Sequence, residues 1–483
     1  MAKKSGHFQT SHGTICADNS IQLKESVMPQ AATAAFDDTD LTLRLAAHGM
    51  GLTFESLPRE TIEVARHCLI DWLGVTLAGS REPLAEIMRA EALEEGGASQ
   101  ATILGGGAMT SVIQAALVNG ATGHALDYDD VNLTMIGHPT AAVAPAILAL
   151  AEKNGLGGKA LLTALVTGIE TECRVGAMMN EAHYNAGWHA TGTVGSFGAA
   201  AGAASLLGLD AEACARALGI AGTQAAGLKA MFGTMCKPFH AGKAASNGLY
   251  AAMLSSRGFE SRTDVLECEQ GFADTQTTDY DPAAAMDQLG TKFHTPNVLF
   301  KYHAACYGTH AVIEAAASLK RAHNIDPANV EKIEIGVRDT LLKMCNIQEP
   351  VTGLEGKFSM RFTAAMALLG ENTGLIANYN EIKVQEAEIV NLRDRIKVVN
   401  NKDMGKAEAA MSISMKDGSV HQIRTDVETP DSDLDRQWSR LSAKFLDMAG
   451  PVIGDAKAAR VVELVAGLEN AADLNEVTAL CKG

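Results

Sequence analysis

The chain has 483 residues, of which 47% are hydrophobic and 20% charged, a composition typical of a well-packed globular protein and not of a disordered one. This length exceeds what one hydrophobic core normally supports, so two domains are expected. The net charge of −17, from 40 Lys and Arg against 57 Asp and Glu, argues against binding to the phosphates of nucleic acids.

The N-terminal segment, residues 1–37, lacks the apolar core of a secretory signal, and we predict a flexible tail there. The nine cysteines are scattered, without a Cys-x-x-Cys pair. That pattern favours reduced thiols and fits no usual zinc or iron–sulfur spacing. The sequence also contains no apolar run long enough to span a bilayer. We therefore expect a cytoplasmic protein that binds neither membranes nor nucleic acid.

Residues 38–280 show the apolar periodicity of helices almost throughout. Examples are TIEVARHCLIDWLGVTLAG, TSVIQAALVNGATGHAL and TAAVAPAILALAEKNG, several of them apolar nearly all round, which indicates buried helices. Alanine and glycine are abundant, as in GTVGSFGAAAGAASLLG, so some helices are expected to approach closely. The segment ILGGGAMT lacks the Gly-Lys-Ser/Thr of a phosphate-binding loop, and we interpret it as a turn between helices.

The pattern changes over residues 281–435, where alternating runs indicate strands. VEKIEIGVRD and RIKVVNN each predict one strand, and MSISMKDGSVHQIRTD predicts a hairpin around Asp417-Gly418. FSMRFTAAMALLGEN between them is helical, and residues 436–483 return to amphipathic helix. The predicted fold is mainly α, with a large helical body built from both ends of the chain and a smaller α+β module.

Carboxylates and imidazoles are concentrated in residues 124–139, which read HALDYDDVNLTMIGHP between apolar segments. Three aspartates (Asp127, Asp129, Asp130) and two histidines (His124, His138) are costly to bury unless they are paired. The segment therefore predicts a functional site. The alternative is a polar loop whose aspartates cap the next helix.

Four other polar residues stand in segments of small side chains. His189 precedes a small-residue helix, where it could hold a carboxylate or be a buried histidine satisfied by a neighbour. Lys237 precedes a proline, which predicts extended geometry and a helix start favourable to an anion; His240 follows it. Lys301 stands beside two aromatics as a ligand or as a side chain that reaches the surface.

Five of these segments resemble, in order, the motifs of the MmgE/PrpD family, which includes 2-methylcitrate dehydratase, cis-aconitate decarboxylase and iminodisuccinate epimerase. They are HALDYDD with GHPT, GWHATGTVGSFGAA, GTMCKPFHAGKAASNGL, FKYHAACYGTH and KFSMRFTAAMALL, after the opening LIDWLGVTLAGS. The resemblance covers the chain from about residue 40. It implies a large all-helical domain (residues 38–280 and 436–483), a smaller α+β lid domain (residues 281–435), a homodimer, and no metal or other cofactor.

The resemblance also implies an active site between the domains, formed by the residues that match the family's motifs. His138 would be the principal acid/base, Asp127 would orient an imidazole, and His189 would bind a substrate carboxylate or assist a leaving hydroxyl. Lys237 and Lys301 would bind carboxylates and stabilise an enediolate, and His240 is a further substrate-binding candidate.

Two positions depart from the decarboxylase pattern. Val131 stands where that pattern has threonine, with one residue fewer before the His-Pro pair, and Leu342 stands where it has tyrosine. Both differences argue against cis-aconitate decarboxylase. The first hypothesis is therefore a hydro-lyase for a methylcitrate-like hydroxy acid, and the second an epimerase of an amino- or iminodicarboxylate. A decarboxylase and a non-catalytic carboxylate-binding protein follow, and each takes a small di- or tricarboxylate as its ligand.

Overall fold

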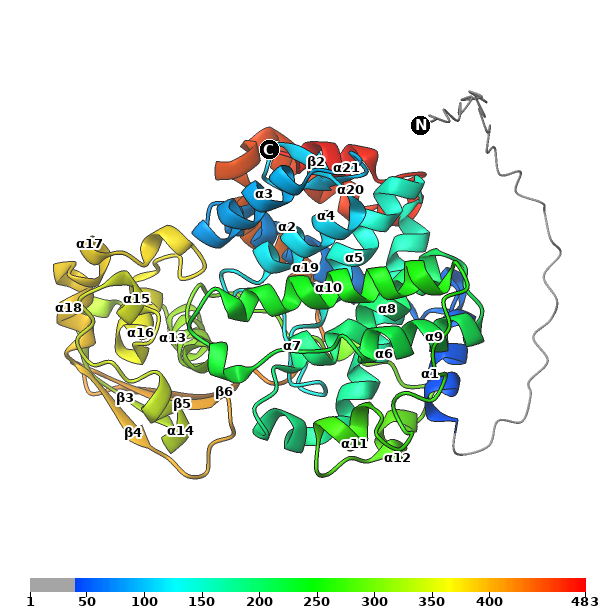
Figure 1. Cartoon of the computed structure of the whole chain (residues 1–483). Coiled ribbons are helices and arrows are strands. Elements are labelled where there is room, and N and C mark those ends of the chain that lie inside the picture. Colours follow the sequence, from blue (N-terminus) through cyan, green and yellow to red (C-terminus); the bar gives the residue numbers. More distant parts are fainter. Residues whose placement is uncertain (1–39) are drawn as a thin grey trace, which may run out of the picture. The chain divides into compact units, whose positions relative to one another are not determined.

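The computed structural model describes residues 40–483, and the tail predicted over residues 1–37 lies outside them. The described chain is mainly helical, as predicted, and contains two small sheets (Figure 1). Asp38–Gly483 form one compact unit, so the division into two domains stays a prediction. Among the helices of residues 40–483, none combines the length and the apolar character needed to cross a bilayer.

Helices from both ends of the described chain pack together. C-terminal α19 packs along α2, and α20 contacts both of them; Figure 1 shows these orange and red helices beside the blue ones. The principal helices of this part are α1 (Leu41–Gly51), α2 (Arg59–Gly79), α3 (Pro83–Glu95), α4 (Val112–Gly123), α5 (Pro139–Asn154), α6 (Gly158–Asn185), α7 (Ala190–Thr193), α8 (Gly195–Leu206), α9 (Ala211–Gly222), α10 (Cys236–Ser255), α11 (Phe272–Gln276), α12 (Pro282–Met286), α19 (Leu434–Ile453), α20 (Asp455–Ala466) and α21 (Asn475–Leu480).

Close helix packing was expected from the small residues, and α4 and α10 confirm it. A Cβ atom on Gly242 of α10 would lie 2.2 Å from the carbonyl oxygen of Leu117, and one on Gly120 of α4 would lie 2.8 Å from Gly242 Cα. Only glycine allows these two backbones to lie so close together. The contact matters for the site because α4 leads into the Asp-rich segment and α10 carries Lys237.

The glycine-rich segment is a turn, but its predicted neighbours were wrong. It joins two antiparallel strands, β1 (Ala101–Ile103) and β2 (Ala108–Thr110), and not two helices. Gly105 and Gly107 take φ values of 65° and 68°, which favour glycine. Strands of three residues are too short to leave an alternating pattern in the sequence, so the region expected to be all-helical contains a small sheet.

The second sheet confirms the predicted strands, with the order β4-β3-β5-β6. β3 pairs in parallel with β4 and antiparallel with β5, and β5 and β6 form the hairpin expected around Asp417-Gly418. Helices α13 and α16 bury their apolar sides together with the sheet in one cluster of hydrophobic residues. The elements are α13 (His310–His323), β3 (Val330–Val337), α14 (Asp339–Met344), α15 (Gly353–Gly356), α16 (Met360–Leu369), α17 (Glu381–Val384), α18 (Ala387–Arg393), β4 (Ile396–Asn400), β5 (Glu408–Met415) and β6 (Val420–Asp426).

Candidate active site

Asp127 is the centre of the charged cluster, in the turn that follows α4. Its φ of 51° lies in the left-handed region, which aspartate tolerates better than most residues, and its side chain is 57% exposed toward a pocket. Lys237 Nζ lies 2.8 Å and Lys301 Nζ 3.0 Å from its Oδ1, and Lys301 also donates to the Asp127 carbonyl oxygen at 2.5 Å. Two ammonium groups therefore converge on one carboxylate.

The two lysines come from distant elements. Lys237 lies in the first turn of α10, so the extended geometry predicted before Pro238 was wrong. A proline is tolerated in the first helical turn, where its missing N–H has no partner to lose. Lys301 follows a short segment in which Leu299 exchanges backbone hydrogen bonds with Val131, and it is only 5% exposed.

Opposite charges keep Asp127 and Lys301 ionised. The protein surrounding Asp127 opposes its ionisation, but Lys301 and Lys237 hold the pKa of this carboxyl well below its ordinary value. Burial alone would lower the pKa of Lys301, yet Asp127 and Asp129 raise it above the ordinary value. Lys237, Asp127 and Lys301 thus form a unit with more positive than negative charge.

Asp129 is the carboxylate nearest to two imidazoles of the site. Its Oδ2 lies 2.9 Å from His124 Nδ1 and 3.2 Å from His138 Nδ1. His138 Nε2 lies 3.7 Å from Asp127 Oδ1. Although burial opposes its ionisation, both histidines hold the pKa of Asp129 well below its ordinary value. Sequence reasoning gave the orienting role to Asp127 and missed Asp129, for which the only signal was its place in the same cluster.

His189 immediately precedes α7, as predicted, and stands against His240. The two Nδ1 atoms lie 3.1 Å apart, and the His189 ring lies 5.8 Å from that of His124. Burial lowers the pKa of His124 to about 4 and moves the pKa of His189 well below its ordinary value. His240 is not among the residues that line the pocket and contacts His189, so its predicted role in binding substrate stays a prediction.

Asp130 fits the alternative prediction of a helix cap. Its carboxyl group accepts from the backbone N–H of Thr140 in the first turn of α5, at 3.4 Å, and from the Thr140 hydroxyl. Burial raises the pKa of Asp130 to about 8. The three aspartates of one short segment therefore differ: one faces the pocket, one pairs with histidines and one stabilises a helix end.

Residues of the charged cluster line a pocket of about 790 Å³. Most other lining residues are apolar or aromatic, and they come from both the helical region and the sheet-containing region. These residues are Pro83, Leu84, Ala125, Val131, Leu133, Ile136, Tyr184, Phe232, Met235, Pro238, Tyr307, Leu354 and Phe358. Of the two positions that depart from the decarboxylase pattern, Val131 lines the pocket, whereas Leu342 lies in α14 against the second hydrophobic cluster.

Comparison with models of known protein families shows to which family the chain belongs. The MmgE/PrpD N-terminal domain model matches residues 43–285, and the MmgE/PrpD C-terminal domain model matches residues 303–470. The chain belongs to the MmgE/PrpD family. The earlier resemblance is thereby confirmed over most of the chain.

Several relatives of this MmgE/PrpD protein are named. The chain is 27% identical over 462 residues to the cis-aconitate decarboxylase-like protein oryM of Aspergillus oryzae (strain ATCC 42149 / RIB 40), covering 88% of this chain and 94% of that one. It is 25% identical over 472 residues to cis-aconitate decarboxylase of Aspergillus terreus, covering 91% and 95%. Against cis-aconitate decarboxylase of Homo sapiens the identity is 28% over 386 residues, covering 76% and 79%. The family and these relatives indicate an enzyme of the lyase class.

The same cluster contains donors that a metal ion can use. His124, Asp127, Asp129 and His138 offer ligand atoms that all lie within 4.8 Å of one another. Imidazole and carboxylate are ordinary ligands of divalent cations. However, the ammonium groups of Lys237 and Lys301 contact Asp127, and their charge opposes a second cation there. The arrangement suits an anion better than a metal.

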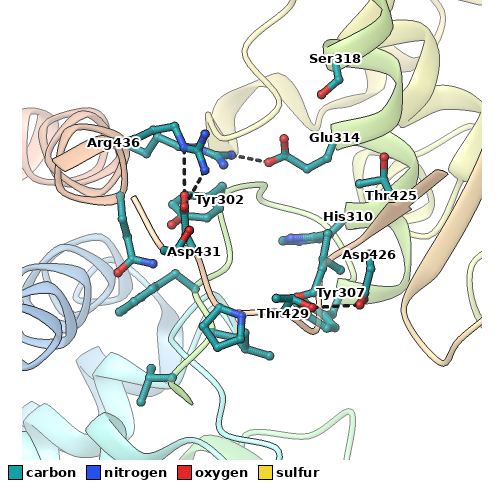
Figure 2. Close-up of a pocket in the computed structure, with 18 residues that line it drawn as sticks. Tyr302, Tyr307, His310, Glu314, Ser318, Thr425, Asp426, Thr429, Asp431 and Arg436 are labelled. Carbon is teal, nitrogen blue, oxygen red and sulfur yellow. Dashed lines mark hydrogen bonds and ion pairs between the residues drawn. The ribbon is translucent and has the colours of Figure 1, made fainter. Parts of the chain in front are cut away.

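A second cavity, of about 360 Å³, lies between α13, α19 and the segment after β6 (Figure 2). It also holds histidine, carboxylates and cations, but its arginines are individually paired. Arg436 binds Asp431, and Arg440 binds Glu314 while its guanidinium lies 3.5 Å from the centre of the Tyr302 ring. Figure 2 shows Asp431 beside Arg436, on the side of the cavity opposite His310. We therefore place the candidate site at Asp127 and not here.

Proposed function

We propose that this protein is a metal-independent lyase that moves a proton on the carbon next to a carboxylate of a small di- or tricarboxylic acid. The first reaction to test is that of a hydro-lyase of the 2-methylcitrate dehydratase type. The observation that carries the proposal is the convergence of Lys237 and Lys301 on Asp127 beside His138. Cations and an imidazole that line the same pocket are what such chemistry requires.

The acid/base role is proposed for His138. Asp129 lies on the Nδ1 side of its ring, so the carboxylate favours a proton on Nδ1 and leaves the lone pair of Nε2 for a substrate proton. Nε2 lies on the side of Asp127, whose side chain faces the pocket. The ring can therefore receive a proton from carbon without losing its orientation.

The lysines are proposed to stabilise the product of that step. When the proton leaves, the electron pair moves onto the neighbouring carboxylate and forms an enediolate with one further negative charge. Ammonium groups close to it stabilise the transition state more than the ground state. Dehydration is completed when the enediolate expels the β-hydroxyl group, which takes up the proton that His138 removed from carbon and leaves as water. His189 is proposed to assist that departure by a hydrogen bond to the hydroxyl.

Cis-aconitate decarboxylation is the second candidate, because the named relatives carry that activity in their names. Val131 in the pocket is the residue that counts against it, since a valine cannot donate the hydrogen bond of a threonine hydroxyl. Epimerisation of an amino- or iminodicarboxylate is the third candidate and needs the same proton abstraction. We also propose that the protein is cytoplasmic and forms a homodimer.

Proton NMR in deuterated water, with a panel of tricarboxylates and aminodicarboxylates, distinguishes these reactions. A new alkene signal with all carboxylates retained supports the hydro-lyase. Loss of a carboxylate with release of carbon dioxide supports the decarboxylase, and deuterium uptake without net product supports the epimerase. If binding occurs without exchange or product, the protein is a carboxylate-binding protein and the proposal is wrong.

A further inference from the structure

A buried lysine from the C-terminal part of the chain contacts the segment that carries Asp127 and Asp129. Lys444 of α19 is only 6% exposed, and its Nζ donates to Oδ1 of Asp71 in α2 at 2.6 Å. The same Nζ donates to the carbonyl oxygen of Tyr128 at 2.8 Å and lies 3.8 Å from the centre of the Tyr128 ring. Lys444 is not among the residues that line the pocket, so it can act on the reaction only through the residues that it contacts.

Tyr128 stands between two aspartates with different partners. Asp127 before it pairs with the lysines of the pocket, and Asp129 after it pairs with two histidines. Two successive carbonyls of this turn each accept from a buried lysine: that of Asp127 from Lys301, and that of Tyr128 from Lys444. The Tyr128 carbonyl and the N–H of Asp129 belong to one planar peptide group. Because the plane is rigid, a fixed carbonyl restricts the directions that the Asp129 side chain can take.

The pair of Asp71 and Lys444 is poorly explained by stability alone. Burial raises the pKa of Asp71 to about 6 and lowers the pKa of Lys444, although each partner opposes the effect on the other. The second carboxylate oxygen of Asp71 is buried and has no hydrogen-bond partner among the described residues. Buried ion pairs often add no stability over well-packed apolar side chains. An apolar side chain, however, could not donate to the Tyr128 carbonyl.

Resting on the proposed function, we propose that Lys444 is a positioning residue of the reaction. It fixes the carbonyl of Tyr128 and thereby keeps Asp129 directed at the imidazole of His138. Asp71 is the counter-ion that allows an ammonium group to lie in this buried place. Since the lysines of the pocket are held by other contacts, the loss of Lys444 should disturb proton transfer more than the binding of substrate.

Two double variants that differ in one hydrogen-bond donor test this role. Asp71→Asn is combined either with Lys444→Gln or with Lys444→Met. The two new side chains at position 444 are similar in length, and both combinations remove the same two charges, but only the glutamine amide can donate to the Tyr128 carbonyl. Thermal melting shows that both variants fold. A difference in turnover between them therefore cannot come from the loss of the ion pair.

Steady-state kinetics with the best acid of the NMR panel measures the effect. The variant with Lys444→Met is expected to lower kcat about 30-fold and to change KM less than about twofold, because a small misplacement of a catalytic group slows the chemical step. The variant with Lys444→Gln is expected to keep kcat within about threefold of wild type, since it retains a neutral hydrogen bond.

Amide hydrogen exchange of residues 124–139, followed by mass spectrometry, gives a measurement that does not need turnover. Exchange should be faster in the variant with Lys444→Met than in the one with Lys444→Gln, because the backbone at Tyr128 loses a partner. Lys320→Met is the matched control. Lys320 donates to the carbonyl of Leu368 and is not among the residues that line either cavity, so its loss should leave kcat and this exchange unchanged.

The outcomes separate this inference from the proposed function. Equal kcat, or equal exchange of residues 124–139, in the two double variants would overturn the positioning role of Lys444 and leave the lyase standing. A loss confined to KM would also overturn it. If the wild-type protein turns over no acid of the panel, the proposed function fails, and the exchange measurement alone decides whether Lys444 holds the segment.

Discussion

The Asp127 pocket and the second cavity contain similar groups in different proportions. In the pocket, Lys237 and Lys301 share one carboxylate, whereas in the second cavity Arg436 and Arg440 each have a carboxylate of their own. Cations that share a partner retain charge for an anion from solution, while individually paired cations do not. The ratio of cations to carboxylates therefore distinguishes a binding site from a structural network of ion pairs.

The largest effect is expected from His138→Ala. Loss of the acid/base group should lower kcat about 1,000-fold, within the range that general acid–base catalysis contributes. Turnover is measured with the best acid of the NMR panel, and folding by thermal melting, which should stay near wild type. His421→Ala is the control, since this histidine stacks on His323 and lies outside both cavities. Activity retained in His138→Ala would remove the acid/base assignment.

Lys237→Ala is expected to have the next largest effect. Removing one of the two ammonium groups should lower kcat/KM about 100-fold, because the enediolate loses a preorganised electrostatic partner. The loss should appear in kcat as well as in KM, which steady-state kinetics with the same acid will show. A change in KM alone would restrict Lys237 to ground-state binding.

A pH effect on stability is expected at Asp130. Burial raises the pKa of Asp130 from its ordinary value of 3.8 to about 8, so at intermediate pH the folded state holds a proton that the unfolded state has lost. This contribution to stability is full below pH 4 and is lost as pH rises toward 8, by at most about 1.4 kcal/mol per pH unit. Asp130→Asn should remove this part of the dependence of the free energy of unfolding on pH.

Urea unfolding at pH 5, 6, 7 and 8 measures that slope in the wild type and in Asp130→Asn. Glu314 in the second cavity makes the free energy of unfolding depend on pH in the opposite direction. His303 and Arg440 hold the pKa of this carboxyl below its ordinary value, although burial opposes this. Its contribution is lost as pH falls below that ordinary value. Identical slopes for wild type and Asp130→Asn between pH 5 and 8 would show that this carboxyl group is ionised in the folded protein.

The smallest effect is expected from Arg440→Ala in the second cavity. Turnover should stay within about twofold of wild type, while the free energy of unfolding falls by about 1 kcal/mol because Glu314 keeps His303 but loses Arg440 as a partner. Steady-state kinetics and urea unfolding measure the two quantities. A loss of activity as large as that of Lys237→Ala would break the distinction between the two cavities.

Much of the fold could be predicted from the sequence, because its elements have strong local patterns. The hairpin around Gly418 and the long apolar helices are examples. The meeting of Asp127, Lys237 and Lys301 was predicted from the order of the family's motifs, not from spacing, since these residues come from three distant segments.

The rest depended on backbone details that the sequence pattern does not carry. The left-handed turn at Asp127 directs that side chain to the lysines and leaves Asp129 with the histidines, so the roles of neighbouring aspartates could not be separated in advance. The helical conformation of Lys237 depends on Pro238 standing in the first turn of α10. His240 shares a segment with Lys237 and contacts His189, and this meeting of two segments distant in the chain leaves no mark in the local sequence pattern.

The glycine contact between α4 and α10 has a consequence for the precision of the site. The two helices touch at Gly120 of α4 and Gly242 of α10. Asp127 follows the end of α4, and Lys237 lies at the start of α10. Two backbones in direct contact have no rotatable side chain between them. The separation of the two backbones that carry Asp127 and Lys237 is therefore set by a main-chain contact, which thermal motion of core side chains changes little.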